Sequence, residues 1–131
     1  FRELIGKECV LFQEFLINIE TQGEISLIMI GGKYTHAVKK IAKKGDFRVQ
    51  DDHGGTVEQY IATESEIEFA KKCLEKCQYS PIYARVDVVY DNNNKLSLSE
   101  LELIEPELWF RNKPESATLL AEVVFSLLSS K

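Results

Sequence analysis

The chain has 131 residues, a formal net charge of −5, 44% hydrophobic residues and 28% charged residues. This composition is too apolar for a disordered chain and is typical of one globular domain that folds without a disulfide or metal staple. The acidic balance argues against a general binder of nucleic acid or of membrane surfaces. No apolar run approaches the roughly 18 residues of a membrane span, and three cysteines cannot all pair, so we expect a cytoplasmic protein.

The first half of the chain is rich in strand signals. Residues Glu8–Leu16 carry Val, Leu and Phe and predict a strand, and Glu24–Ile30 is a nearly continuous apolar run that predicts a buried one. The Gly31-Gly32 pair predicts a tight hairpin with Lys33–Ile41 as the returning strand. Residues Ala42–Val57 show no helical period and carry three glycines among many charges, which predicts a long loop of the kind that is usually functional.

A helix is predicted next, at Thr63–Cys77. Thr63 and Glu66 have the spacing of a capping box, and the apolar residues that follow recur at intervals of three and four. That apolar stripe consists of Ile67, Ala70, Cys73, Leu74 and Cys77.

A second hairpin and a last helix complete the chain. Ile82–Tyr90 and Leu96–Ile104 predict two strands joined by the turn residues Asp91–Asn94. The last helix is predicted to begin near Pro114, with an apolar stripe of Ala117, Leu120, Ala121, Val124, Leu127 and Leu128. Two strand pairs, each followed by a helix, predict an α+β fold: an antiparallel β-sheet with helices packed on one face.

The second hairpin concentrates charge. Because side chains alternate across a strand, Arg85 and Asp87 share one face of their strand, and Glu100 and Glu102 share one face of the partner. An even-length turn would place Arg85 opposite Glu100, and both charged rows would then lie on the same side of the sheet. The same register places Tyr90 opposite Lys95.

Such a face has two possible interpretations. Three close carboxylates repel one another unless a cation lies among them, and oxygen ligands suit Mg²⁺, so Asp87, Glu100 and Glu102 are candidate metal ligands. The alternative is a solvated outer face with a cross-strand ion pair between Arg85 and Glu100.

The remaining reactive residues indicate less. Basic residues on or near the Ala42–Val57 loop, together with its glycines, could wrap phosphates, or they could be scattered charge on a surface loop. They are Lys39, Lys40, Lys43, Lys44 and Arg48. The two histidines have no cysteine near them in sequence, so a structural zinc site is poorly supported, and the three cysteines fit core packing better than metal binding.

Several short motifs occur in a characteristic order along the chain. They are Gln13-Glu14-Phe15, Gly23-Glu24, residues 31–38 (GGKYTHAV), residues 45–50 (GDFRVQ), His53-Gly54-Gly55, residues 83–88 (YARVDV) and residues 100–106 (ELELIEP). With this ordered set the chain resembles the carboxy-terminal subdomain of the ATP-grasp superfamily, over nearly all of its length. The resemblance is greatest to prokaryotic glutathione synthetase-like and cycloserine-biosynthesis-type carboxylate–amine ligases.

The resemblance implies a role for each matching position. Gln13, Glu14, Phe15 and Leu16 would hold adenine, and Glu24, or less favourably Glu20, would accept hydrogen bonds from the ribose hydroxyls. Arg48 and the loop at Gly54 and Gly55 would close over the phosphates. Arg85 would hold the γ-phosphate or the acyl phosphate, and Asp87, Glu100 and Glu102 would bind Mg²⁺. Some relatives have Asn where Glu102 stands, and Glu keeps an oxygen ligand there.

The resemblance also implies an activity. ATP would phosphorylate a substrate carboxylate, and an amine would displace the phosphate, so nucleotide, acid and amine are the expected partners, with no nucleic acid and no membrane. The amino-terminal substrate domain and the central subdomain of such ligases are absent from residues 1–131, which we interpret as one subdomain that is inactive alone and could form a homodimer. Two alternatives are a degenerate ATP-grasp module that only binds or assembles, and a metal-dependent phosphoesterase using the same carboxylates.

Overall fold

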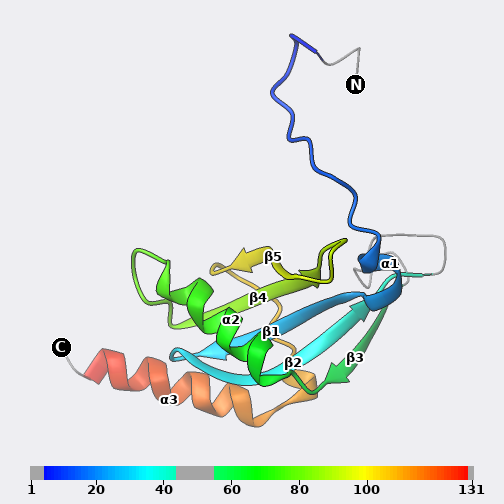
Figure 1. Cartoon of the computed structure of the whole chain (residues 1–131). Coiled ribbons are helices and arrows are strands. Elements are labelled where there is room, and N and C mark those ends of the chain that lie inside the picture. Colours follow the sequence, from blue (N-terminus) through cyan, green and yellow to red (C-terminus); the bar gives the residue numbers. More distant parts are fainter. Residues whose placement is uncertain (1–4, 44–54, 130–131) are drawn as a thin grey trace.

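A computed structural model describes residues 5–43 and 55–129 of the chain. The sheet is five-stranded with the order β3-β2-β1-β4-β5, and every neighbouring pair is antiparallel. The elements, in chain order, are α1 (Asn18–Gln22), β1 (Glu24–Ile30), β2 (Lys33–Ile41), β3 (Thr56–Tyr60), α2 (Glu64–Glu75), β4 (Tyr83–Tyr90), β5 (Leu96–Glu102), the 3-10 helix η2 (Phe110–Asn112) and α3 (Glu115–Ser129). Figure 1 shows α2 lying across the sheet and residues 5–16 extending away from it as an arm.

Both faces of the sheet are covered by helices. Strand β1 is buried along its whole length and sends alternate side chains to the two faces. Leu27 and Met29 pack with Ala70 and Leu74 of α2. Ile28 and Ile30 pack in a second core that α3 and the segment around Trp109 complete. The predicted antiparallel sheet with helices is confirmed, but the expectation that the helices share one face is wrong, because the second face is also apolar along part of its length.

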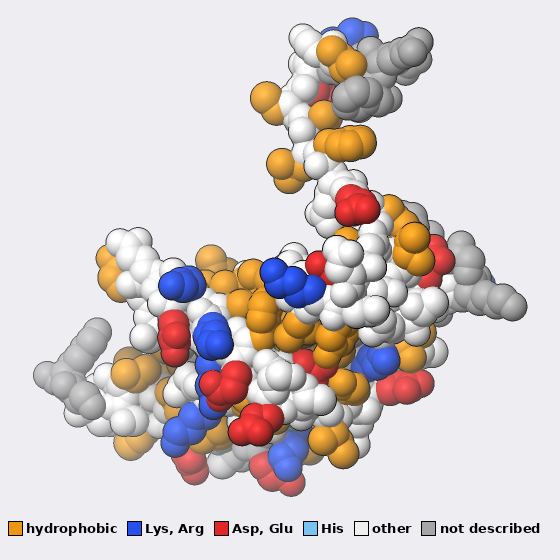
Figure 2. Space-filling view, viewed as in Figure 1, with side chains coloured by type: hydrophobic (Ala, Val, Ile, Leu, Met, Phe, Trp, Pro, Cys, Tyr) orange, Lys and Arg blue, Asp and Glu red, His pale blue; other side chains and the backbone are white. Residues whose placement is uncertain are grey.

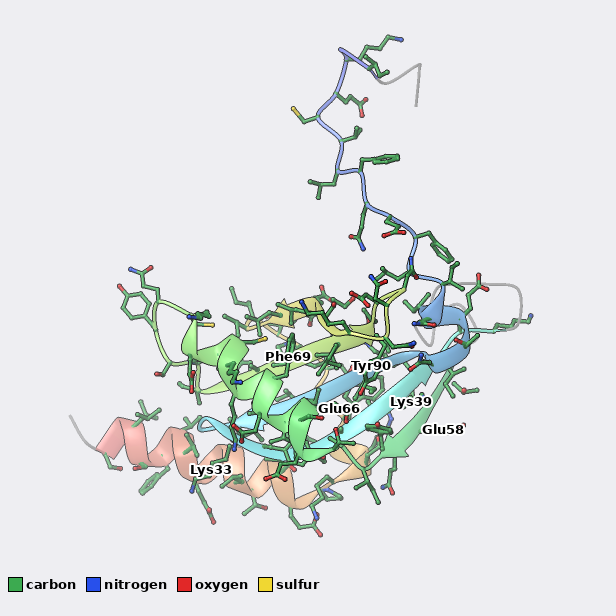
Figure 3. All side chains as sticks on the ribbon, viewed as in Figure 1. Lys33, Lys39, Glu58, Glu66, Phe69 and Tyr90 are labelled. Carbon is green, nitrogen blue, oxygen red and sulfur yellow. The ribbon has the colours of Figure 1, made fainter. Side chains whose placement is uncertain are left out.

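The predicted capping box starts α2. The Thr63 side chain accepts a hydrogen bond from the Glu66 backbone N–H, and the Glu66 carboxylate accepts one from the Thr63 N–H at 2.7 Å. The Glu66 side chain is fully buried and also accepts hydrogen bonds from the hydroxyls of Tyr60 and Tyr90. Figure 3 shows Glu66 and Tyr90 together between α2 and the sheet. The carboxylate therefore joins the helix start to strands β3 and β4.

Other predicted elements are confirmed or corrected. The hairpin at Gly31-Gly32 is present, with both glycines at positive φ. Residues Glu8–Leu16 do not form a strand, because none of the described strands lies alongside them in a sheet. Hydrophobic side chains are exposed along the arm (Figure 2), and the side chains of Leu11 and Phe12 are among the exposed ones. The predicted loop Ala42–Val57 overlaps β3, which begins at Thr56. This segment is a strand because its backbone pairs with β2.

The packed face of α3 differs from the predicted stripe. Leu119, Leu120 and Val123 contact the sheet core, whereas Val124 and Leu128 of the predicted stripe are exposed. The apolar pattern is broad along this helix, so the sequence alone left the packed side open, and contact with β1 selected it.

The register of the second hairpin contains a β-bulge. Tyr90 pairs with Leu96, not with Lys95, because Lys95 closes the loop through a hydrogen bond from the Asp91 N–H to its carbonyl at 2.9 Å. The register then shifts by one residue between Asp87 and Val88. As a result Asp87 lies opposite Glu100, and Arg85 lies opposite Glu102 rather than Glu100.

Candidate functional site

One end of the α3-covered face is polar instead of apolar. Strand alternation and register bring charged side chains from four neighbouring strands to this end. These residues, named the charged cluster here, are Glu24, Lys40, Arg85, Asp87, Glu100 and Glu102. The apolar core of the same face begins directly beyond them, at Ile28 and Val38. The charged cluster therefore lies directly beside a packed core, at one end of the same face of the sheet.

Arg85 occupies the centre of the charged cluster. Its Nε donates to both carboxylate oxygens of Asp87 at 3.0 Å, and its Nη2 lies 2.6 Å from Glu102 Oε1. Glu100 is the loosest partner, with Oε2 at 3.4 Å from Nη2 and 55% of its side chain exposed. The predicted common face of Asp87, Glu100 and Glu102 beside Arg85 is confirmed.

A buried lysine extends the charged cluster toward β1 and β2. Lys40 Nζ forms ion pairs with Glu24 and with Asp87 Oδ2, the latter at 3.1 Å, and all three side chains are buried. The sequence had grouped Lys40 with the basic loop. The structure places it inside β2, where it joins the carboxylates of Glu24 and Asp87.

The charges of the cluster do not balance. Four carboxylates lie against two cations, which leaves a formal excess of two negative charges among these described residues. Burial, followed by the charges of Glu102 and Asp87, raises the pKa of Glu100. Burial alone would lower the pKa of Arg85, but its hydrogen bond to Asp87 and the surrounding carboxylates raise it, so the guanidinium stays charged. The part of this shift that comes from neighbouring carboxylates reflects the local excess of negative charge, which an added cation would offset.

The donor set of the cluster suits Mg²⁺ in chemistry but is not arranged around an ion. In residues 5–43 and 55–129 no three His, Cys, Asp or Glu side chains converge on a point that could hold a metal. Asp87 and Glu102 instead direct their oxygens at Arg85. Mg²⁺ in proteins often binds through one or two carboxylates and completes its shell with waters and substrate phosphates, so three carboxylates with spare charge fit such an ion.

A pocket of about 290 Å³ lies between the arm and strands β4 and β5. It is lined by Gln13, Glu14, Phe15, Leu16, Ile19, Val89 and Ser99. The segment predicted to hold adenine thus forms one wall. The β4–β5 loop anchors that wall, because Asn92 donates to the Phe15 carbonyl at 3.0 Å and accepts from the Ile17 N–H at 2.8 Å.

Ser99 connects the pocket to the charged cluster. Its hydroxyl donates to Glu24 Oε2 at 2.9 Å while the same residue lines the pocket. Sequence reasoning did not select Ser99, since a serine in a strand gives no signal of its own.

The structure describes only some of the other predicted residues. Gly55 is partly buried and immediately precedes β3. Arg48 and Gly54 lie outside the described residues, so their predicted contact with phosphates stays a prediction. The alternative ribose residue Glu20 is exposed on α1.

A family model described as the RimK-like ATP-grasp domain matches residues 3–105. The crystal structure of D-cycloserine synthetase DcsG matches with a TM-score of 0.74 and 23% sequence identity, over 88% of this chain and 41% of that one. This chain therefore spans less than half the length of that synthetase. No curated protein matches the chain by sequence.

No helix among the described residues is long and apolar enough to cross a membrane. The family match covers most of the chain, and its range, residues 3–105, includes the strands that carry the charged cluster. The chain belongs to the RimK-like ATP-grasp domain family, a family of ATP-dependent ligases.

Proposed function

We propose that this chain is the part of an ATP- and Mg²⁺-dependent ligase that binds the nucleotide and the metal, and that the whole enzyme joins a carboxylate to an amine through an acyl phosphate. The observation that carries the proposal is a continuous row on one end of the sheet. The pocket at Gln13–Leu16 comes first. Glu24 comes next, joined to the pocket by its hydrogen bond from Ser99, and Arg85 with its carboxylate partners comes last. A base, a sugar and a phosphate chain with its metal need sites in that order.

The residues divide the work along this row. Gln13, Glu14, Phe15 and Leu16 would bind adenine in the pocket, and Glu24 would accept hydrogen bonds from the sugar hydroxyls. Arg48, Gly54 and Gly55 would cover the phosphates. Arg85 is fixed by the carboxylates around it and would direct its charge at the transferred phosphoryl group. Such fixed charges stabilise negative charge in the transition state without reorganising during the reaction.

Asp87, Glu100 and Glu102 would hold Mg²⁺. When bound, the metal would neutralise charge on the phosphate oxygens and on the leaving group. The excess of negative charge in the cluster supports this role, because a divalent cation would offset it. The protein then contributes positioning and charge, and little covalent chemistry.

Release of ADP by the full-length protein tests the proposal. A coupled assay would screen panels of carboxylic acids and amines with Mg²⁺, and hydroxylamine in place of the amine would trap an acyl phosphate as a hydroxamate. We expect ADP release that requires both an acid and an amine, and a hydroxamate that requires ATP. The variant Arg85→Lys should lose activity, whereas Glu58→Gln, at an exposed position on β3, should retain it.

Two other results would point elsewhere. Nucleotide binding with no turnover for any acid and amine tried would favour a binding or assembly module. Hydrolysis of phosphate esters with no need for an amine would favour the phosphoesterase.

A further inference from the structure

Ser99 is the extra residue of the bulge in β5. The pairs Val88 with Leu98 and Asp87 with Glu100 are consecutive on β4, so Ser99 has no partner of its own in the register. Without this bulge the register would set Ser99 opposite Asp87 and would turn Glu100 to the face that α2 covers. A shift of one residue reverses the face of every side chain that follows. The bulge is therefore the reason that Glu100 and Glu102 reach Arg85 and Asp87.

The bulge has a second consequence at Glu24. Bulges redirect side chains and are frequent next to functional sites. Here the Ser99 hydroxyl stays on the face of the charged cluster and donates to Glu24 Oε2 at 2.9 Å, while Lys40 forms an ion pair with Oε1. Each oxygen of this buried carboxylate thus has a partner on its own side. Two opposed partners fix the orientation of the carboxylate more firmly than either would alone.

The Glu24 carboxylate lies beside the pocket and is not one of the three proposed metal ligands. Ser99 lines the pocket together with Val89 and the Gln13–Leu16 segment. Lys40 holds the opposite side of Glu24 toward Asp87. A nucleotide with its base in the pocket and its phosphates at Arg85 would therefore bring its sugar past Glu24. A carboxylate oxygen has two lone pairs, so each Glu24 oxygen keeps the capacity to accept one further hydrogen bond.

We propose that Ser99 is a positioning residue for sugar selection: its hydroxyl orients the Glu24 carboxylate to accept hydrogen bonds from both vicinal hydroxyls of a ribonucleotide, and the site thereby discriminates against 2′-deoxyribonucleotides. This inference rests on the proposed function. The bulge then serves two parts of the site, since it brings the metal carboxylates to the correct face and sets the sugar-binding carboxylate through its extra residue.

Calorimetric titration of the full-length protein with ATP and with 2′-deoxyATP, in Mg²⁺ and without acid or amine, tests the inference. The wild type should bind ATP more tightly, and Ser99→Ala should lower the ratio of the two affinities about three- to tenfold, the worth of one hydrogen bond. Ser99→Thr, which keeps the hydroxyl, should retain the ratio. Ser97→Ala is the matched control, because the Ser97 hydroxyl donates to the nearby Lys95 carbonyl and not to Glu24.

A double-variant comparison separates orientation from a general loosening of the fold. In the Glu24→Ala background, Ser99→Ala should change the ratio no further, because both oxygens of the group that it orients are gone. An additive effect, an unchanged ratio in Ser99→Ala, or equal affinities in the wild type would each overturn the inference while leaving the proposed function intact. Failure of the wild type to bind either nucleotide would overturn the proposed function, and this inference with it.

Discussion

Replacing Glu100 by Gln should separate stability from activity. The Glu100 side chain is 55% exposed, and its cationic partner among the described residues, Arg85, lies 3.4 Å away and is already paired with Asp87 and Glu102. An exposed ion pair of this kind contributes about 0–1 kcal/mol to the free energy of unfolding. Repulsion by Glu102 and Asp87 acts in the opposite direction. Burial is the largest cause of the raised pKa of Glu100, and this repulsion is the next. We therefore expect the unfolding free energy of Glu100→Gln to change by less than about 1 kcal/mol.

Activity should respond very differently. The amide removes a negative charge and one oxygen ligand from the proposed magnesium site, and loss of the supporting hydrogen bonds alone costs metal sites about 10- to 100-fold. Loss of a ligand should cost at least about 100-fold in kcat. Urea unfolding measures the unfolding free energy, and ADP release at saturating ATP measures kcat. Glu58→Gln is the control for both measurements.

The pH dependence gives an independent check. Because the pKa of folded Glu100 is raised above its ordinary value of 4.5, the stability that it contributes is complete below that value and is lost as pH rises through the folded pKa. That part of the pH dependence should be absent from Glu100→Gln. Retained activity in this variant would refute the metal assignment. A loss of more than about 2 kcal/mol in stability would refute the assignment of Glu100 to a solvated position.

Three further changes test the framework that positions the site. Glu66→Ala should lower the unfolding free energy by about 3 kcal/mol, because it removes a helix cap and leaves two tyrosine hydroxyls without their acceptor; Glu64→Ala, at an exposed position, should change it little in the same urea experiment. Burial and then Glu66 raise the pKa of Tyr60 to about 12, so the stability that Tyr60 contributes is present below pH 10 and lost as pH rises through 12. The melting temperature of Tyr60→Phe should therefore depend less on pH in that interval, and the same pH dependence in both proteins would contradict this. Gly23→Ala should destabilise the protein by at least about 2 kcal/mol, because the residue has a φ of 69° and its Cβ would lie 2.3 Å from the Lys40 carbonyl oxygen; a normal melting temperature would show that β2 can move aside.

Local sequence patterns determined most of the secondary structure. The glycine pair between β1 and β2, the capping box at Thr63 and the β-branched run of β4 each act within a few residues, so they can be read without knowledge of the fold. Alternation along each strand also paired Arg85 with Asp87 and Glu100 with Glu102, whereas the face that the two pairs share depends on the register and the bulge of the hairpin. The ordered motifs gave the family.

Tertiary structure decided the features that depend on contacts between segments far apart in the sequence. The Glu8–Leu16 segment has the composition of a strand, but none of the described strands lies alongside it, and the hydrogen bonds between neighbouring strands are what make a sheet. The register of β4 and β5 depends on a loop that includes Lys95 and on a bulge at Ser99, neither of which alternation can show. Lys40 reads as one basic residue among several, and only the register of β1, β2 and β4 brings it between the buried carboxylates of Glu24 and Asp87. A buried charge must be compensated by a partner, and that partner is chosen by the fold, not by the neighbouring sequence.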